Sequence, residues 1–188
     1  MKIILGSQSE GRAQVLSEMG YQFEVMAADI DEKAIRHADP KELVLALANA
    51  KADALLPKIT EHTILITADQ VVVWGNEIRE KPENEEQERY FLKTYHEKPA
   101  EIVNGIVVTN TVTGKRSYAL DASTIFFRKF SEDIIEKIVA MEHIYRRAGG
   151  FAIQDTFIKP YIEKVEGTDD SVIGLPKQLT ERLIKEVQ

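Results

Sequence analysis

Residues 2–12 read KIILGSQSEGR: an apolar run, then small polar residues, then a charged segment. The apolar run Lys2–Leu5 predicts a short buried strand, and residues 10–19 predict a helix that ends at Gly20. Residues 6–9 form the loop between them. Because a helix amino end offers free backbone N–H groups and the positive end of its dipole, such a loop suits a phosphate group.

Polar side chains in the same stretch favour phosphate binding. Ser7 and Ser9 supply hydroxyls, and Arg12 supplies a guanidinium in the first turn of the helix. The spacing differs from that of a P-loop, because G-x-x-x-x-G-K-[ST] is absent. The alternative is an ordinary strand-to-helix turn with a surface arginine.

The rest of the chain alternates between helix and strand signals without a linker, a repeat or a low-complexity tract. The clearest helix start is at Asp39, which caps the helix, and Pro40, which takes its first position. Further helices are predicted over 83–94, 131–141 and 176–187, strands over 21–26, 63–67, 71–74 and 151–153, and a long β-hairpin over 102–110 and 122–127. This order predicts a single α/β domain, residues 1–188, with a mixed central sheet and flanking helices.

Composition excludes several classes of function. The 188 residues are 44% apolar and 29% charged, and none is cysteine, which excludes disulfides, thiolate nucleophiles and cysteine zinc sites. Apolar runs such as 64–66 and 71–74 are far shorter than the roughly 20 residues that cross a bilayer. A net charge of −7 suits neither nucleic acid nor an anionic membrane, so we expect neither as a partner. The expected location is the cytoplasm.

Asp69 is the main candidate for catalysis. It follows the predicted strand 63–67, at the edge where open α/β sheets place their ligands. A carboxylate there can activate water as a base or hold a divalent cation. The alternative is a solvated aspartate in a turn.

Two lysines and an acidic loop add further candidates. Lys51 lies among three alanines that let a partner approach closely, and Lys81 follows the strand signals at 71–74. Glu32, in an acidic loop, offers a second carboxylate for a metal ion, although lysines and acidic loops are usually solvated. The four histidines show no metal-ligand spacing, and we interpret them as structural or surface groups: His37, His62, His96 and His143.

Six short motifs carry a family resemblance. They are Leu5-Gly6-Ser7-x-Ser9-x-x-Arg12, Ala50-Lys51-Ala52, Thr67-Ala68-Asp69-Gln70-Val71-Val72, Lys81-Pro82, Ala148-Gly149-Gly150-Phe151 and Ser171-Val172-Ile173-Gly174-Leu175-Pro176. In this order they resemble Maf proteins over essentially residues 2–186. The resemblance implies a Maf/ITPase-like fold, a single domain with two lobes around a cleft. It also implies a nucleoside triphosphate pyrophosphatase, in which water attacks the α-phosphorus and releases a nucleoside monophosphate and pyrophosphate.

The same resemblance implies roles for single residues. Asp69 matches the proton acceptor of Maf proteins, and Glu32 matches a carboxylate that holds the metal ion together with Asp69. The residues that match the substrate-binding set are Ser7, Arg12, Lys51, Lys81, Gln70 and Gln154. Maf proteins require a divalent cation, here Mg²⁺, Mn²⁺ or Co²⁺, and the resemblance implies a homodimer.

Departures from the common Maf pattern concern the base. Gly11 stands where other Maf loops carry Arg or Trp, Gln70 resembles the branch that prefers 7-methyl-GTP, and Gln154 resembles the branch that prefers dTTP and UTP. Because a glutamine amide can pair with the imide edge of uracil or thymine, we expect UTP and dTTP, or modified nucleotides, as substrates. The alternatives are a 7-methyl-GTP pyrophosphatase and a nucleotide-binding regulator of cell division without turnover. A carboxylate and two lysines within the motifs favour an enzyme.

Overall fold

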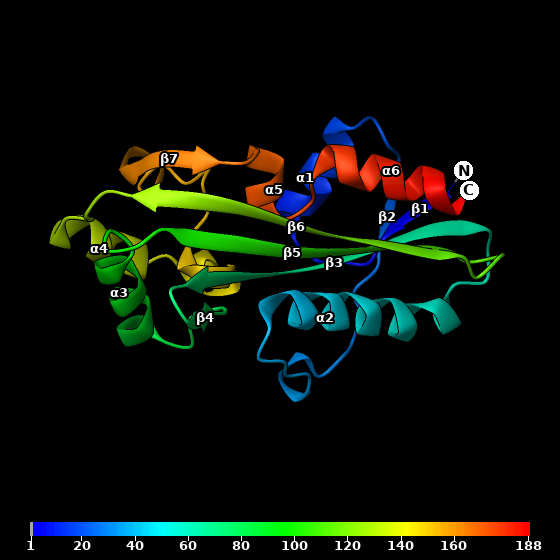
Figure 1. The fold of residues 1–188 in the computed structure, drawn as a ribbon, viewed down its shortest axis with the longest axis horizontal. Coiled ribbons are helices and arrows are strands. Elements are labelled where there is room, and N and C mark those ends of the chain that lie inside the picture. Colours follow the sequence, from blue (N-terminus) through cyan, green and yellow to red (C-terminus); the bar gives the residue numbers. More distant parts are fainter. Residues whose placement is uncertain (1) are drawn as a thin grey trace. The chain divides into compact units, whose positions relative to one another are not determined.

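A computed structural model describes residues 2–188 of the chain. The strands are β1 (Lys2–Leu5), β2 (Glu24–Val25), β3 (Thr63–Trp74), β4 (Glu77–Arg79), β5 (Ala100–Asn110), β6 (Arg116–Phe127) and β7 (Ile162–Glu166). They form one sheet in the order β2-β1-β3-β5-β6-β7, with β4 paired to β3 (Figure 1). Parallel and antiparallel pairs both occur, which confirms the predicted α/β class with a mixed sheet.

Six α-helices flank the strands. They are α1 (Glu10–Glu18), α2 (Pro40–Leu55), α3 (Glu85–Thr94), α4 (Glu132–Val139), α5 (Asp169–Ile173) and α6 (Lys177–Val187) within residues 2–188. Short 3₁₀ segments cover Glu32–Ala34, Leu56–Lys58, Glu142–Arg146, Ala148–Gly150 and Lys159–Tyr161. Among the described residues, no helix combines the length and the apolar character that a membrane crossing needs.

The chain forms two compact units. Unit 1 comprises Met1–Gln70, Asn104–Asp121 and Ile173–Gln188, and unit 2 comprises Val71–Val103 and Ala122–Val172. The chain passes between them several times, so neither unit is one continuous stretch of sequence.

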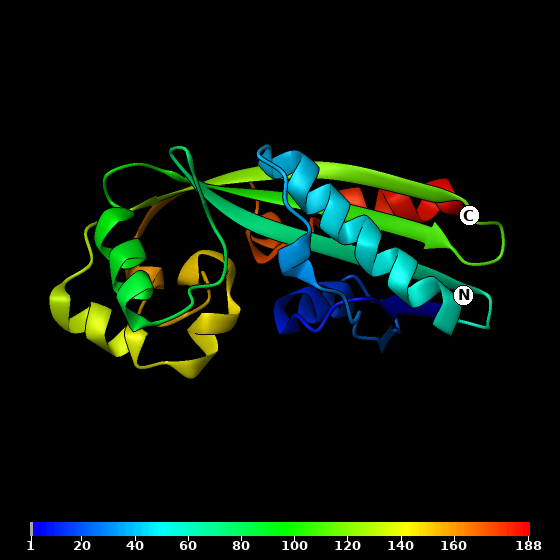
Figure 2. The same ribbon diagram turned by 90° about the horizontal axis from the view of Figure 1, so that it is seen from below.

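Unit 1 is built in three layers. Strand β1 pairs in parallel with β2 and with β3, and Leu5 lies opposite Val25 and Ile66. Helix α2 covers one face of these strands, and α1 and α6 cover the other (Figures 1 and 2). Successive side chains of β3 therefore enter different cores, because neighbouring residues of a strand point to opposite faces. Ile66 packs with α1 and α6, whereas Leu65 packs with α2.

The structure corrects the prediction around Asp69. The sequence predicts two strands, 63–67 and 71–74, with Asp69 and Gln70 in the gap between them. Instead, β3 is one strand from Thr63 to Trp74, and both residues lie inside it. Their side chains must therefore alternate between the two faces of the strand.

Unit 2 has an aromatic core. Tyr95 at the end of α3 lies 5.2 Å from Phe127 and 5.4 Å from Phe151, measured between ring centroids. Helices α3 and α4 pack against each other beside it. The predicted strand 151–153 is wrong, because Phe151 and Ala152 pair with no strand and Ile153 begins a turn. The polar edge strand β7 and the short helix α5 lie where the sequence predicted turns.

Candidate active site

Lys51 is the centre of a charged cluster in unit 1. Its ammonium Nζ lies 2.8 Å from Glu32 Oε1 and also forms an ion pair with Asp69 Oδ1. The Lys51 and Asp69 side chains are only 11% and 12% exposed, whereas Glu32 is 42% exposed. A single buried ammonium thus brings together two carboxylates that lie 37 residues apart in the sequence.

Local packing places these three side chains. Ala48 and Ala52, one on each side of Lys51 along α2, are completely buried, and their small size lets the helix approach β3 closely. The Thr67 hydroxyl donates to the Ala48 carbonyl over 2.8 Å, which ties β3 to α2 just before Asp69. Of the three alanines noted in the sequence around Lys51, only Ala52 is completely buried, whereas Ala50 and Ala54 are partly exposed.

The carboxylates fit a divalent cation. Carboxylate oxygens of Asp69 and Glu32 both contact the same atom, Lys51 Nζ, so the two side chains are close enough to bind one cation together. Carboxylate oxygens are the ligands that Mg²⁺ and Mn²⁺ prefer. Residues 2–188 contain no group of three or more such ligands. A cation held here would therefore complete its coordination with water or with phosphate oxygens, as Mg²⁺ commonly does.

Arg12 and Ser7 form a second part of the site. Arg12 Nη1 donates to Ser7 Oγ over 3.2 Å and to the Ala68 carbonyl over 2.9 Å, and Nε donates to the Gly174 carbonyl over 3.0 Å. Burial lowers the pKa of the Arg12 guanidinium, while the negative charges of Asp69 and Glu32 act in the opposite direction. Arg12 is therefore a buried residue, contrary to the alternative of a surface arginine.

Asp69 and Gln70 face opposite sides of β3. Asp69 points toward Lys51 of α2, whereas Gln70 lies on the side of Gly174 and Arg12. Asp69 was expected after the end of strand 63–67, or in a solvated turn, but β3 continues through both residues. The Asp69 side carries the carboxylates, and the Gln70 side carries the arginine.

Two of the predicted binding residues belong to unit 2. Lys81 follows β4 and is exposed, and Gln154 is exposed in the turn after Phe151. The preceding glycine motif is tied to the Lys81 segment, because the Gly149 N–H donates to the Glu80 carbonyl over 2.9 Å. One of the four histidines has a charged neighbour: His143 Nε2 lies 3.3 Å from Asp155 Oδ2, and no motif in the sequence had suggested this contact.

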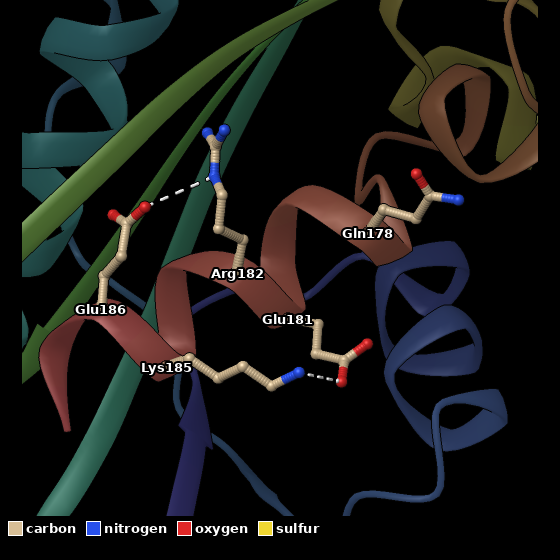
Figure 3. A pocket seen from close by; sticks show the side chains of 5 residues that line it. All are labelled: Gln178, Glu181, Arg182, Lys185 and Glu186. Atoms are coloured by element: carbon tan, nitrogen blue, oxygen red, sulfur yellow. Dashed lines mark hydrogen bonds and ion pairs between the residues drawn. The ribbon is translucent and has the colours of Figure 1, made fainter.

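A depression of about 440 Å³ lies on the surface of α6, apart from this cluster. Figure 3 shows its lining: Gln178, Glu181, Arg182, Lys185 and Glu186. Its charged groups pair along the helix, Lys185 with Glu181 at 2.8 Å and Arg182 with Glu186 at 3.4 Å. None of the candidate site residues lines it, and we interpret it as a hydrated helix face.

The sequence signals missed two groups. One is the backbone of Gly174, whose carbonyl binds Arg12; the motif 171–176 contained this glycine without suggesting a role. The other is Glu88 in unit 2, which is completely buried although it stands in a strongly charged helix. No sequence signal separates Glu88 from the exposed acidic residues beside it.

Comparison with known proteins identifies the family. A 7-methyl-GTP pyrophosphatase of Dictyostelium discoideum is 43% identical over 98% of this chain and 96% of its own. A nucleoside triphosphate pyrophosphatase of Synechococcus sp. (strain JA-3-3Ab) is 35% identical over 98% and 93% of the two chains. A dTTP/UTP pyrophosphatase of Desulforamulus reducens is 33% identical over 93% and 90%. Residues 2–187 match the family described as Maf-like protein. The chain belongs to this Maf-like family.

Proposed function

We propose that this protein is a nucleoside triphosphate pyrophosphatase, a hydrolase that acts on a phosphorus-containing anhydride. The observation that carries the proposal is the meeting of Lys51 with Asp69 and Glu32 beside the buried Arg12. Carboxylates for water and metal, next to cations for phosphate, are the groups that hydrolysis of a triphosphate needs. The names of the three relatives support the same reaction class.

The proposed reaction uses few protein groups. Water attacks the α-phosphorus, the bond from that phosphorus to the oxygen of the β-phosphate breaks, and pyrophosphate leaves. The Asp69 carboxylate accepts the proton of the attacking water. Lys51, Arg12 and Ser7 bind phosphate oxygens and keep the triphosphate in place. Glu32 and Asp69 would hold a divalent cation, which would neutralise part of the phosphate charge.

A release assay tests this proposal. Pyrophosphate and nucleoside monophosphate are measured over a panel of common and modified nucleoside triphosphates, with Mg²⁺, Mn²⁺ or Co²⁺ and after chelation by EDTA. We expect both products in equal amounts and only with a cation. Nucleotide binding without product would instead support the regulator of cell division, and release of inorganic phosphate would contradict attack at the α-phosphorus.

We expect Lys51→Ala to raise KM and to lower kcat. Its ammonium is a phosphate contact in the proposal, and a charge-assisted hydrogen bond of this kind is worth about 1.5–3 kcal/mol, so kcat/KM should fall about 10- to 100-fold. Steady-state kinetics on the best substrate measure this. Lys58→Ala, an exposed lysine in the 3₁₀ segment after α2, is the matched control. Equal KM and kcat for the two variants would show that Lys51 does not bind the substrate.

The preferred base has two candidates, each with its own support. The Gln154 amide favours UTP and dTTP, because it can donate to and accept from an imide edge. The identity of 43% with a relative named 7-methyl-GTP pyrophosphatase favours 7-methyl-GTP. We propose UTP and dTTP as the first candidate, and the panel assay decides between the two.

Gln154→Glu should move this preference. A carboxylate cannot donate to a uracil carbonyl, but it attracts the positive ring of a methylated guanine. We expect the ratio of kcat/KM for UTP to that for 7-methyl-GTP to fall about tenfold, which corresponds to the loss of one good hydrogen bond. An unchanged ratio would show that Gln154 does not select the base.

Two further parts of the proposal rest on the family resemblance: the protein uses Mg²⁺, Mn²⁺ or Co²⁺, and it forms a homodimer. The cytoplasmic location rests on the apolar pattern of the sequence alone. Light scattering of the purified protein tests the dimer, and a monomeric mass at micromolar concentration would exclude it.

A further inference from the structure

The turn around Gly174 contacts Arg12 directly. The Gly174 carbonyl accepts a hydrogen bond of 3.0 Å from Arg12 Nε, and this buried bond joins residues 162 positions apart. Both residues belong to unit 1. The motif 171–176 thus has a physical connection to the phosphate loop that its sequence did not suggest.

Arg12 has one nitrogen left for a ligand. Nε is bound to the Gly174 carbonyl, and Nη1 is bound to the Ala68 carbonyl and to Ser7 Oγ. Within residues 2–188, Nη2 makes no hydrogen bond. Because the guanidinium is planar and rigid, fixing Nε and Nη1 also fixes the direction in which Nη2 points.

Gly174 also leaves the space that this orientation needs. Its φ of +103° is a conformation that other residues rarely adopt. A Cβ placed there would lie 3.2 Å from Arg12 Nε, 3.3 Å from Arg12 Nη2 and 3.1 Å from Gln70 Nε2. These distances are tighter than ordinary van der Waals contacts, so with a side chain at this position the guanidinium and the Gln70 amide would have to shift by a few tenths of an ångström.

We infer that Gly174 is a positioning residue, which aims Arg12 Nη2 at the phosphates of the bound nucleotide. The inference rests on the proposed function, since it requires a triphosphate as ligand. Asp69 faces Lys51 of α2, whereas Gly174 approaches Arg12 and Gln70 on the other side of β3. Loss of the Gly174 contact should therefore weaken substrate binding and leave the chemical step nearly unchanged.

The test compares Gly174→Ala with Gly20→Ala. Gly20 has a φ of +81° and nothing within 4 Å of a Cβ placed on it, so this control adds backbone strain at the end of α1 without a contact to Arg12. We expect Gly174→Ala to raise KM about tenfold with kcat within about twofold of the wild type, because one charge-assisted contact is weakened. We expect Gly20→Ala to leave both constants as they are. Equal effects of the two variants would overturn the inference.

A double-mutant cycle shows whether Gly174 acts through Arg12. Arg12→Lys keeps the charge, but a lysine cannot hold both carbonyls, so KM should rise in this variant too. In the Arg12→Lys background, Gly174→Ala should raise KM no further. A further rise in KM in the double variant would overturn the inference. So would an unchanged KM in Arg12→Lys alone, and this variant can be measured even if Gly174→Ala fails to fold. A wild type that hydrolyses no nucleotide would overturn the proposed function and this inference together, whereas an active wild type with an unmoved KM would overturn this inference alone.

Discussion

Asp69→Asn should lose most of the pyrophosphatase activity and keep its fold and its nucleotide affinity. The amide oxygen of the substituted side chain can still accept a hydrogen bond from Lys51, so the packing of β3 against α2 is retained. An amide can neither accept a proton from water nor hold a cation as a carboxylate does. Loss of a general base typically lowers kcat by about 100- to 10,000-fold.

The measurement is kcat on the best nucleotide of the panel, together with the melting temperature and the nucleotide Kd. Asp29→Asn, the same change at an exposed position three residues before Glu32, is the control. A near-normal kcat in Asp69→Asn would show that another group is the general base. A large drop in melting temperature would instead show that Asp69 serves the fold.

Glu88→Gln should stabilise the protein at neutral and alkaline pH. Glu88 is completely buried in unit 2, and neither of its carboxylate oxygens has a hydrogen-bond partner among residues 2–188. Burial raises the pKa of Glu88 from 4.5 to about 9, and the charge of Arg79 opposes this only in part. The folded protein therefore holds this carboxyl group in its neutral form at pH 7, with a proton that the unfolded chain releases.

The direction of the pH effect follows from proton binding. Between pH 4.5 and about 9 the folded state binds one proton more than the unfolded state at Glu88, so the free energy of unfolding falls as pH rises. Below pH 4.5 Glu88 does not lower the free energy of unfolding, and from there up to about pH 9 it lowers it progressively. At about 1.4 kcal/mol per pH unit, the loss at pH 7 is about 3 kcal/mol.

Urea unfolding at pH 5 and at pH 8 measures this effect. We expect Glu88→Gln to match the wild type closely at pH 5 and to exceed it by several kcal/mol at pH 8, since glutamine has a similar shape and no proton to lose. Glu86→Gln, at an exposed position of the same helix, controls for the change of net charge. The same pH dependence in the wild type and in Glu88→Gln would contradict the burial of an unpaired carboxyl group.

The start of α2 was predictable because it depends on neighbouring residues: Asp39 caps the helix by accepting a hydrogen bond from the Lys41 N–H. The start of α3 was predicted at residue 83, whereas Asn84 is the cap and accepts from the Gln87 N–H. The hairpin of β5 and β6 was predicted, but its second strand was expected only over 122–127, whereas β6 already begins at Arg116, directly after the turn at Gly114. The predicted strand 151–153 failed because a short apolar run carries no information about whether a neighbouring strand exists to pair with it.

The sequence by itself determined the α/β class, the family and the identity of the charged residues at Lys51, Asp69 and Arg12. These follow from local periodicity and from short motifs, which need no knowledge of distant contacts. Only the tertiary structure decided that Lys51 joins Asp69 to Glu32, that Asp69 and Gln70 face opposite sides of one strand, and that Arg12 is held by a carbonyl 162 residues away. The physical reason is that strand continuity depends on hydrogen bonding to neighbouring strands, and the partners of a buried charge depend on how helices pack against the sheet. Neither the continuity of a strand nor the partners of a buried charge can be read from a short stretch of the chain.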